Sequence, residues 1–366
     1  MNSMDASIII PTFNEAPNVP ELIRRIEEAV GGRRVELVFV DDSSDETPAV
    51  IERAALGSTI PIRLVRRPHP TGGLAGAVLE GLRTASSDWC VVMDGDLQHP
   101  PEVIPALLDA AAEQGADLVV ASRHIVGGSS AGLGGRLRHL VSSSATALTR
   151  AIFPVRLRDC TDPMTGFFAV KRSSVNLDAL RPRGFKILLE ILARNTLAVV
   201  ERPFVFGERN AGESKANLRQ GVRFLIQLVT LRFGRAPGFA IIGALGAVGN
   251  LAIMAGLQAF GVWYLLAATI AALVTMTTNF ALQERFVFHD VRGDGGVERR
   301  FAQSLGFNGT ETAVRTLLLW LIVASTAIPD ILVQAVLLGT AFALRFAFHS
   351  RVIYRPRRAS SMEVAS

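Results

Sequence analysis

Two carboxylates and an amide lie together in the polar segment Asp94-Gly95-Asp96-Leu97-Gln98-His99-Pro100, which follows an apolar run. Carboxylate and amide oxygens are hard ligands, and they suit Mg²⁺ or Mn²⁺ when the phosphates of a substrate fill the remaining coordination positions. Asp94, Asp96 and Gln98 are therefore candidate metal ligands. The alternative is a solvated turn after a strand, which would need no cation.

Two further polar clusters follow apolar runs earlier in the chain. They are Thr12-Phe13-Asn14-Glu15 and Asp41-Asp42-Ser43-Ser44-Asp45. Acidic groups at adjacent strand ends repel one another unless a cation or hydrogen-bond donors join them. The acidic clusters therefore favour a ligand site over independent solvated turns.

Strands and helices must alternate to position these clusters. Buried strands are expected at 7–10, 36–40, 62–65 and 89–93. Helices are expected at 17–30, 47–56 and 74–85. This order predicts a parallel sheet with right-handed crossovers, and ligands of such sheets bind beyond the carboxyl ends of the strands. The three polar clusters should therefore converge on one edge of an α/β domain.

The second half of the chain has a different composition. No Asp, Glu, Lys or Arg lies between Arg235 and Glu284, and only Asp330 lies between Arg315 and Arg345. The first uncharged segment, cut at its central turn, gives two pieces long enough to cross about 30 Å of hydrocarbon. Four transmembrane helices are expected at 237–260, 263–283, 303–327 and 331–350. The composition excludes a secreted disulfide scaffold, a disordered chain and a purely soluble enzyme.

These differences in charge and hydrophobicity divide the chain into four parts. They are a soluble domain at 1–217, an amphipathic interface helix at 218–234, an all-α transmembrane domain of four helices at 235–355 and a basic, disordered tail at 356–366. The membrane part contains a weak repeat, because Phe280-Ala281-x-x-x-Arg285-x-Val287-Phe288 recurs as Phe346-Ala347-x-x-x-Arg351-x-Ile353-Tyr354. We therefore expect two helical hairpins of similar design.

Basic residues predict the orientation in the membrane. The connection 285–302 carries Arg285, Arg292, Arg299 and Arg300, whereas the other two turns carry none. The N-terminus has no basic segment before its short apolar stretch, so it does not resemble a signal peptide. By the positive-inside rule we expect the soluble domain, both termini and the 285–302 connection to be cytoplasmic.

The net charge of +5 does not indicate a nucleic-acid partner. The excess is spread along the chain and includes an arginine-rich tail directly after the last apolar segment, a position that fits the anionic head groups of a lipid bilayer. Cys90 and Cys160 show no metal-binding spacing, and we expect both to be reduced and structural.

Six motifs occur in order along residues 6–216. They are Ile10-Pro11-Thr12-Phe13-Asn14-Glu15, Val40-Asp41-Asp42-Ser43-Ser44-Asp45, Asp94-Gly95-Asp96-Leu97-Gln98-His99-Pro100-Pro101, Asp162-Pro163-Met164-Thr165-Gly166-Phe167-Phe168, Gly184-Phe185-Lys186-Ile187-Leu188-Leu189-Glu190 and Gly207-x-Arg209-x-x-Gly212-Glu213-Ser214-Lys215. Together they resemble the family 2 inverting glycosyltransferases, and among these the dolichol (polyprenol) phosphate mannose synthases. The membrane half resembles the small four-helix domain that is fused to some of these synthases.

The resemblance implies a GT-A type fold and a binding site for a nucleotide-sugar donor. The implied donor-binding residues are Pro11, Phe13, Glu15, Val40, Asp42, Asp94, Gly95, Asp96, Arg209, Ser214 and Lys215. Asp96 takes the metal-ligand position, and Arg209 and Lys215 would join it in catalysis. Phe13 stands where the family usually has Tyr, which keeps a stacking face but removes the hydroxyl.

The resemblance also implies an acceptor site in which Arg123, Arg138 and Ser142 bind the phosphate of polyprenyl (dolichyl) phosphate. A phosphate monoester is mostly a dianion near neutral pH, so it needs little help from a general base. His99 is accordingly interpreted as structural. The implied reaction is inverting transfer of mannose from GDP-mannose. Alternatives are a UDP-glucose or UDP-amino-sugar donor, or a lipid-linked sugar flippase with a degenerate soluble domain.

Polar residues are unusual in the membrane half. They are Asn250, Asn279, Asn308, Glu311 and Arg315. Glu311 and Arg315 are spaced i, i+4 on one expected helix and can pair, which lowers the cost of burying either. These residues favour either polar packing between helices or a lipid-handling groove, and the sequence leaves both interpretations open.

Overall fold

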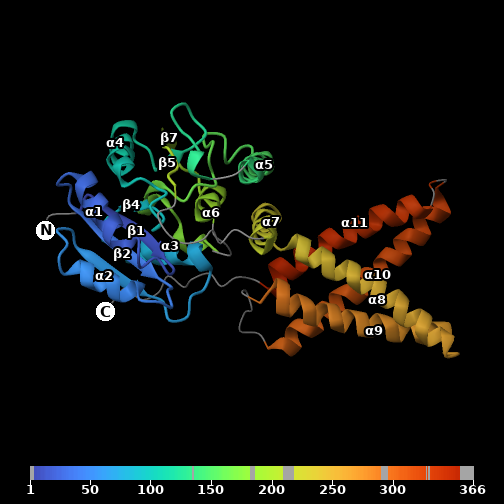
Figure 1. Ribbon diagram of the computed structural model, residues 1–366. Helices are drawn as coiled ribbons and strands as arrows, with labels where there is room; N and C mark the ends of the chain where they lie inside the picture. The colour runs from blue at the N-terminus through green and yellow to red at the C-terminus, as the bar shows by residue number, and fades with distance from the viewer. Residues whose placement is uncertain are drawn as a thin grey trace, which may run out of the picture. The chain divides into compact units, whose positions relative to one another are not determined.

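The computed structural model describes residues 4–133, 136–181, 186–208, 218–289, 296–326, 328 and 330–354. The chain forms two compact units, Met1–Arg232 and Phe233–Ser366. Figure 1 shows the first unit as a sheet with helices around it and the second as helices alone. Each unit is considered by itself below.

The first unit is built on a seven-stranded sheet of order β3-β2-β1-β4-β6-β5-β7. Its strands are β1 (Ala6–Thr12), β2 (Val35–Asp41), β3 (Ile62–Arg66), β4 (Trp89–Val92), β5 (Leu118–Ser122), β6 (Phe168–Lys171) and β7 (Val199–Pro203). The first four strands pair in parallel, as the sequence predicts. Strand β6 is antiparallel to both β4 and β5, so the sheet is mostly parallel.

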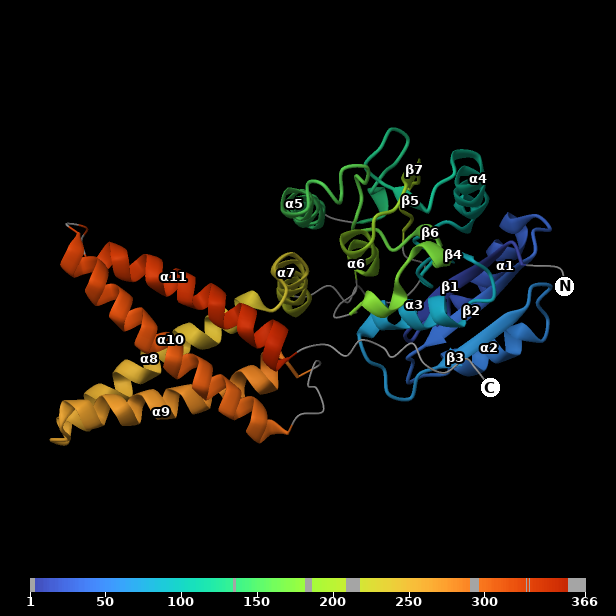
Figure 2. The ribbon, with the colours of Figure 1, turned by 180° about the vertical axis from the view of Figure 1, so that it is seen from behind.

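Helices cover both faces of this sheet (Figures 1 and 2). They are α1 (Val19–Val30), α2 (Thr47–Ala55), α3 (Gly73–Thr84), α4 (Ile104–Gln114), α5 (Arg136–Ile152), α6 (Ile187–Arg194) and α7 (Leu218–Phe233). Side chains alternate along a strand, so Ile8 and Ile10 pack against α1 and α4, while Ile9 packs against α3. Short 3₁₀ turns, among them η1 (Pro101–Val103), η2 (Ala131–Leu133), η3 (Arg172–Ser174) and η4 (Leu177–Ala179), complete the unit.

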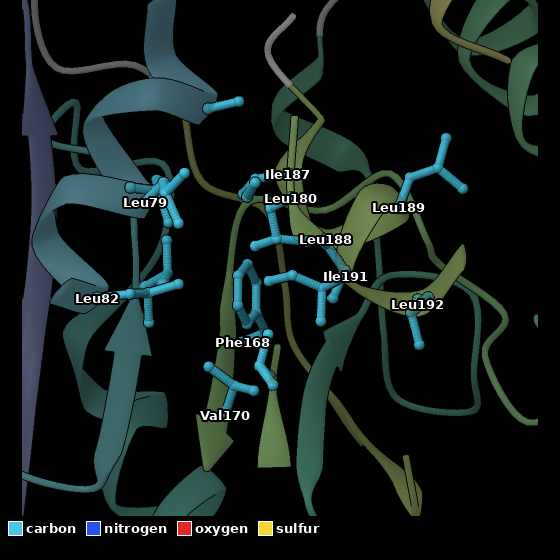
Figure 3. Close-up of a cluster of buried hydrophobic side chains, with 14 of the residues drawn as sticks. Leu79, Leu82, Phe168, Val170, Leu180, Ile187, Leu188, Leu189, Ile191 and Leu192 are labelled. Atoms are coloured by element: carbon cyan, nitrogen blue, oxygen red, sulfur yellow. The ribbon is translucent and has the colours of Figure 1, made fainter. Parts of the chain in front are cut away.

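The core beneath α3 and α6 joins the two halves of the sheet. Figure 3 shows Leu79 and Leu82 of α3 facing Phe168 of β6, with Leu188 and Ile191 of α6 on the other side. These side chains are buried, which fixes β6 between β4 and β5. Cys90 and Cys160 belong to the same core as free thiols, as expected from the sequence.

Helix α7 belongs to the first unit. Its Phe224 and Leu228 are buried in the core under α6, and Gln227 Nε2 donates to the carbonyl oxygen of Lys186 at 3.2 Å. Apolar side chains on the rest of the helix surface are exposed, among them Leu225 and Ile226. The helix is thus amphipathic, and its inner face anchors it to the sheet domain.

The second unit consists of long helices. They are α8 (Ala236–Ala259), α9 (Tyr264–Leu282), α10 (Val297–Ser325) and α11 (Asp330–Phe348), close to the expected ranges. Among the described residues, three spans are long and apolar enough to cross a membrane: Ala236–Ala259, Leu266–Val287 and Val336–Ile353. Helix α10 is long but carries Glu311 and Arg315, so the expected number of four spans is approximate.

The sequence repeat in the second unit corresponds to a structural repeat. Helices α9 and α11 each pass into a π-helical turn, η5 (Gln283–Val287) and η6 (His349–Ile353). The residues that follow, Phe288 and Tyr354, occupy equivalent repeat positions and stack with ring centroids 4.1 Å apart. Tyr354 also donates its hydroxyl to Glu284 at 2.6 Å. The two hairpins therefore meet at their matching ends.

Candidate active site

The polar ends of the first strands lie at one edge of the sheet, as predicted. Thr12 and Asp41 are register partners in β1 and β2, and Thr12 Oγ1 donates to Asp41 Oδ1 at 2.8 Å. The next residue, Asp42, donates its backbone N–H to the Thr12 carbonyl at 3.0 Å. Strand β4 lies on the other side of β1, so its carboxyl end reaches the same edge.

The segment after β1 presents an aromatic face. Asn14 has φ of 58°, and its backbone N–H and side-chain oxygen bond to Ser43 Oγ and the Ser44 N–H at 2.8 and 3.0 Å. This turn leaves the Phe13 side chain 46% exposed, so its ring is accessible for stacking. Pro11 and Val40 are buried, so they can contribute to a ligand site mainly through their backbone.

The acidic end of β2 is neutralised by the protein itself. Arg67, from the loop after β3, donates Nε to Asp42 Oδ1 at 2.8 Å and Nη2 to Asp42 Oδ2. Arg67 also bonds the carbonyl oxygens of Thr71 and Gly73 at 3.0 and 3.1 Å. A cavity of about 350 Å³ adjoins this pair, with lining residues that include Val65, Arg66, Arg67, His69 and Glu80. Sequence reasoning missed Arg67.

The end of β4 forms a compact acidic loop. Asp96 is buried, and its Oδ1 accepts the backbone N–H of Gln98 at 3.1 Å. Leu97 between them has φ of 65°, a left-handed conformation that is costly for a residue with a Cβ. A strained turn of this kind is typical of a functional site, because it bends the backbone so that nearby side chains converge.

Two hydrogen bonds join this acidic loop to Gly207, the first residue of the last of the six motifs. Gln98 Nε2 donates to the Gly207 carbonyl at 3.1 Å, and the Gly207 N–H donates to the Gln98 carbonyl at 2.9 Å. Gly207 opens the last of the six motifs. The structure therefore brings the start of that motif to the acidic loop.

His99 is buried next to the acidic loop and is bonded to its backbone. Its Nδ1 accepts the backbone N–H of Asp94 at 3.0 Å, and its ring stacks on Phe167 with centroids 5.2 Å apart. Burial disfavours the charged imidazole and lowers the pKa of His99 to about 4. A neutral ring whose Nδ1 is occupied by a backbone bond fits the structural interpretation of His99.

Arg123, at the end of β5, is held by a buried carboxylate. Its Nε and Nη2 donate to Asp162 Oδ2 and Oδ1 at 2.7 and 2.9 Å, and its guanidinium lies 5.5 Å from the centroid of the Phe206 ring. Burial alone would raise the pKa of Asp162, but the hydrogen bonds and charge of Arg123 hold it below its usual value. One side of this guanidinium is therefore fixed within the protein.

Lys186 is a cation that sequence reasoning did not assign to the site. Its Nζ donates to the Met164 carbonyl at 2.6 Å. Burial and then the charge of Arg123 lower the pKa of Lys186 to about 8, while Asp94 and Asp162 act in the opposite direction. These interactions place Lys186, Arg123, Asp94 and Asp162 in one electrostatic neighbourhood. The signal in the sequence is a lysine directly before the apolar run of α6.

Several predicted residues cannot be placed. Arg209, Ser214 and Lys215 lie outside the described residues, and so does the side chain of Arg138, whose backbone belongs to the first turn of α5. Ser142 lies further along the same helix and is half-buried. Their assignment to the donor and acceptor sites therefore stays a prediction.

The oxygen donors at the end of β4 fit a hard divalent cation. In the described part of the chain no group of three or more His, Cys, Asp or Glu side chains could hold a metal alone. Asp94 and Asp96 offer two carboxylates, and the side chain of Asp94 is 35% exposed. Such a pair with an amide oxygen suits Mg²⁺ or Mn²⁺ only when a substrate phosphate and water complete the coordination. This is the donor set predicted from the sequence.

Comparisons with known proteins cover both units. The family model "Glycosyl transferase family 2" matches residues 7–176, and the model "GtrA/DPMS, transmembrane domain" matches residues 238–354. The first match covers strands β1 to β6 and the acidic loop. The second spans the long helices, so the chain is a membrane protein as well as a glycosyltransferase.

Curated relatives agree with both matches. A dolichol-phosphate mannosyltransferase of Pyrococcus furiosus is 38% identical over 79% of this chain and 82% of its own length. A dolichol-phosphate mannosyltransferase of Saccharomyces cerevisiae is 32% identical over 63% and 87%. A polyprenol monophosphomannose synthase of Mycolicibacterium smegmatis is 32% identical over 59% and 83%. The chain therefore belongs to the dolichol-phosphate mannosyltransferases among the family 2 glycosyltransferases, and it carries a GtrA/DPMS transmembrane domain.

Proposed function

We propose that this enzyme transfers mannose from GDP-mannose to polyprenyl (dolichyl) phosphate, with inversion at the anomeric carbon. The observation that carries the proposal is the pairing of opposite charges in one site. Asp94 and Asp96 suit a cation that binds a diphosphate, while Arg123 and Lys186, which interacts electrostatically with Asp94, suit an anionic acceptor. The names of the relatives support mannose as the transferred sugar and a polyprenyl phosphate as the acceptor.

The donor would bind along the ends of β1, β2 and β4. Phe13 offers a stacking face for the base, and Asp42 lies beside the cavity near Arg67. Mg²⁺ or Mn²⁺ held by Asp94, Asp96 and Gln98 would supply positive charge that neutralises the departing nucleoside diphosphate. The remaining donor contacts are assigned to Pro11, Glu15, Val40, Gly95, Arg209, Ser214 and Lys215.

The acceptor phosphate would be held by Arg123, Arg138 and Ser142, and we add Lys186 to this set. Asp162 fixes the guanidinium of Arg123 through Nε and Nη2, which orients its other edge for a phosphate oxygen. An acceptor with a lipid chain must reach the site from a bilayer. Exposed apolar side chains on two helices of this unit, Leu140 and Val141 on α5 and Leu225 and Ile226 on α7, would contact that bilayer.

The chemistry requires no proton-abstracting side chain. The phosphate of the acceptor is mostly a dianion near neutral pH and can attack the anomeric carbon directly. His99 is neutral and bonded to the backbone of Asp94, so it is not available as a base. Arg209 and Lys215 would stabilise the charge that develops on the leaving diphosphate.

We further propose that the catalytic domain, both termini and the 285–302 connection face the cytoplasm. The excess of arginine in that connection favours this orientation. Tags placed at Ser366 and at Gly293 should both be protected from an external protease in intact cells. Cleavage of either tag would contradict the orientation.

A donor comparison tests the proposed reaction. The purified full chain in detergent should form a lipid-linked sugar from GDP-mannose and polyprenyl phosphate, and it should form little from UDP-glucose or UDP-amino sugars. Product from a UDP-sugar instead would replace the donor assignment. No product from any donor, with transport of a lipid-linked sugar in vesicles, would support a flippase, because detergent abolishes transport but not transfer.

A further inference from the structure

The transmembrane domain contains an ionic cluster at the contact between α10 and α11, which pack side by side (Figures 1 and 2). Glu311 Oε1 accepts Arg315 Nε at 3.2 Å, and Glu311 Oε2 accepts Arg345 Nε at 2.6 Å and also Arg345 Nη2. Arg345 Nη2 donates in addition to Thr312 Oγ1 at 3.1 Å. The carboxylate of Glu311 thus accepts hydrogen bonds from two guanidinium groups.

The charges of this cluster do not balance. Two arginines and one glutamate leave one positive charge. His349 lies next to the cluster but adds no charge in this arrangement, because Nδ1 donates to the Arg345 carbonyl at 2.8 Å and Nε2 can then accept the Ser304 hydroxyl at 3.1 Å. The neighbouring Glu284 is itself paired with Arg300 at 2.6 Å. Among the described residues, no second carboxylate contacts Arg315 or Arg345.

The cluster lies inside the expected hydrocarbon layer but near one side of it. At 1.5 Å per residue, Glu311 is about 21 Å from the Ser325 end of α10, and Arg345 is about 22 Å from the Asp330 end of α11. The hydrocarbon layer is about 30 Å thick. The cluster is therefore within reach of the lipid head groups on the side of the membrane away from Ser325 and Asp330. Long arginine side chains extend toward that interface.

The arginines are also partly accessible. The side chain of Glu311 is 8% exposed, whereas those of Arg315 and Arg345 are 17% and 33% exposed. Arg315 bonds Glu311 through Nε, and within the described chain its two terminal nitrogens have no hydrogen-bond partner. A guanidinium with accessible donors next to a second guanidinium is suited to bind phosphate oxygens.

We propose that Glu311, Arg315 and Arg345 form a binding site for the phosphate head group of a membrane lipid. An unbalanced positive charge is costly in hydrocarbon, and an anionic head group would neutralise it. Glu311 would hold the two guanidinium groups side by side, and the accessible nitrogens would contact the phosphate. None of these three residues is among those assigned to the acceptor phosphate in the catalytic domain.

Native mass spectrometry of the full chain in detergent can test this site. The lipids are a polyprenyl monophosphate with polyprenol as its uncharged match, and phosphatidylglycerol with diacylglycerol as its match. Inorganic phosphate is added as a competitor, which distinguishes a lipid site from one for free phosphate. The wild type should retain the phosphate-bearing lipid of at least one pair in excess over its uncharged match.

Variants separate a binding role from a structural one. Arg315→Gln should lower retention of that lipid about tenfold, as expected for one lost charge-assisted contact. Arg285→Gln, at an exposed position outside the cluster, should leave it unchanged. Glu311→Gln keeps a side-chain oxygen that accepts from the arginines but removes the competing negative charge, so retention should be equal to the wild type or higher. Arg315→Lys keeps the charge and serves if Arg315→Gln does not fold.

The proposal is overturned if charged and uncharged lipids bind equally, or if Arg315→Gln retains as much lipid as the wild type. It is also overturned if Glu311→Gln loses lipid as strongly as Arg315→Gln, because the ion pairs would then be structural only. Calorimetry with GDP is a separate readout. Nucleotide affinity should be the same in all these variants, and a lack of GDP binding in the wild type would weaken the proposed donor without affecting the lipid result.

Discussion

The carboxylates at the ends of β2 and β4 have different surroundings. At the end of β2, Asp41 accepts bonds from Thr12 and Ser43, and Asp42 forms a two-point pair with Arg67. At the end of β4, Asp94 Oδ2 lies 3.7 Å from Nδ1 of His99, a neutral ring that accepts the backbone N–H of Asp94. In that neighbourhood Arg123 pairs with Asp162, and Lys186 donates to the Met164 carbonyl.

The acidic motifs after β2 and β4 are similar in sequence, but their different surroundings predict different roles. A carboxylate that is paired with an arginine from its own chain is already compensated and can act by position and shape. Asp94 and Asp96 lie together on the loop bent at Leu97, where two carboxylates can share a divalent cation. We therefore expect substitutions at β4 to affect the chemical step and substitutions at β2 to affect mainly nucleotide affinity.

The largest effect is expected for Asp96→Asn. The amide keeps the shape but removes the charge that the cation requires, so transfer should fall by at least about a hundredfold. Asp41→Asn is the matched substitution at β2 and should leave the transfer rate within a few-fold. Lipid-extractable mannose measures both, and melting curves confirm folding. Equal losses in the two variants would remove the distinction between the strand ends.

The next effect concerns the two arginines assigned to different substrates. Arg138→Ala should weaken the use of polyprenyl phosphate and leave GDP affinity near its original value, whereas Arg209→Ala should do the reverse. Each lost contact should cost about 1.5–3 kcal/mol, or one to two decades. Kinetics with each substrate varied and calorimetry with GDP report both. If Arg138→Ala weakened GDP binding equally, Arg138 would be a structural charge of the whole cleft.

A smaller effect is expected at the compensated end of β2. Arg67→Ala should lower GDP affinity about tenfold, because Asp42 loses the partner that orients it. A double-mutant cycle with Asp42→Asn distinguishes positioning from direct contact. If Arg67 only positions Asp42, the double variant should bind GDP as well as Asp42→Asn alone. Additive losses would indicate that Arg67 itself contacts the nucleotide.

The smallest effect is a pH dependence. The pKa of Lys186 is lowered to about 8, so its positive charge is present below that pH and is lost as the pH rises through it. Use of polyprenyl phosphate should therefore decline several-fold between pH 7 and 9, as the protonated fraction of Lys186 falls. In Lys186→Met the decline should disappear. The ratio of the two profiles removes the titration of the substrates, and identical profiles would exclude a role for the Lys186 charge.

Local patterns predicted much of the fold. The strands at 7–10, 36–40, 62–65 and 89–93 and the helices between them are confirmed, because short apolar runs with polar ends specify buried parallel strands. Strands β5, β6 and β7 were not predicted. Strand β6 is antiparallel to its neighbours, so it lacks the alternation with helices that identified the others.

The candidate site was predicted in part. Asp94, Asp96 and Gln98 are adjacent in sequence, so their spacing alone indicated a common site. The ion pairs that distinguish the strand ends join distant residues: Asp42 with Arg67, and Arg123 with Asp162. Spacing along the chain carries no information about such contacts. The same holds for Arg345, whose pairing with Glu311 depends on how α10 and α11 pack.

The most direct test of the central claim is the stoichiometry of one reaction mixture that contains the full chain, GDP-mannose labelled in the sugar, polyprenyl phosphate and Mg²⁺. GDP released and mannose recovered in the lipid extract are measured in the same sample. We predict that the two amounts are equal for the wild type and that both are close to background for Asp96→Asn. Release of GDP without lipid-linked mannose, or full product from Asp96→Asn, would contradict the assignment of polyprenyl phosphate mannosyl transfer to the end of β4.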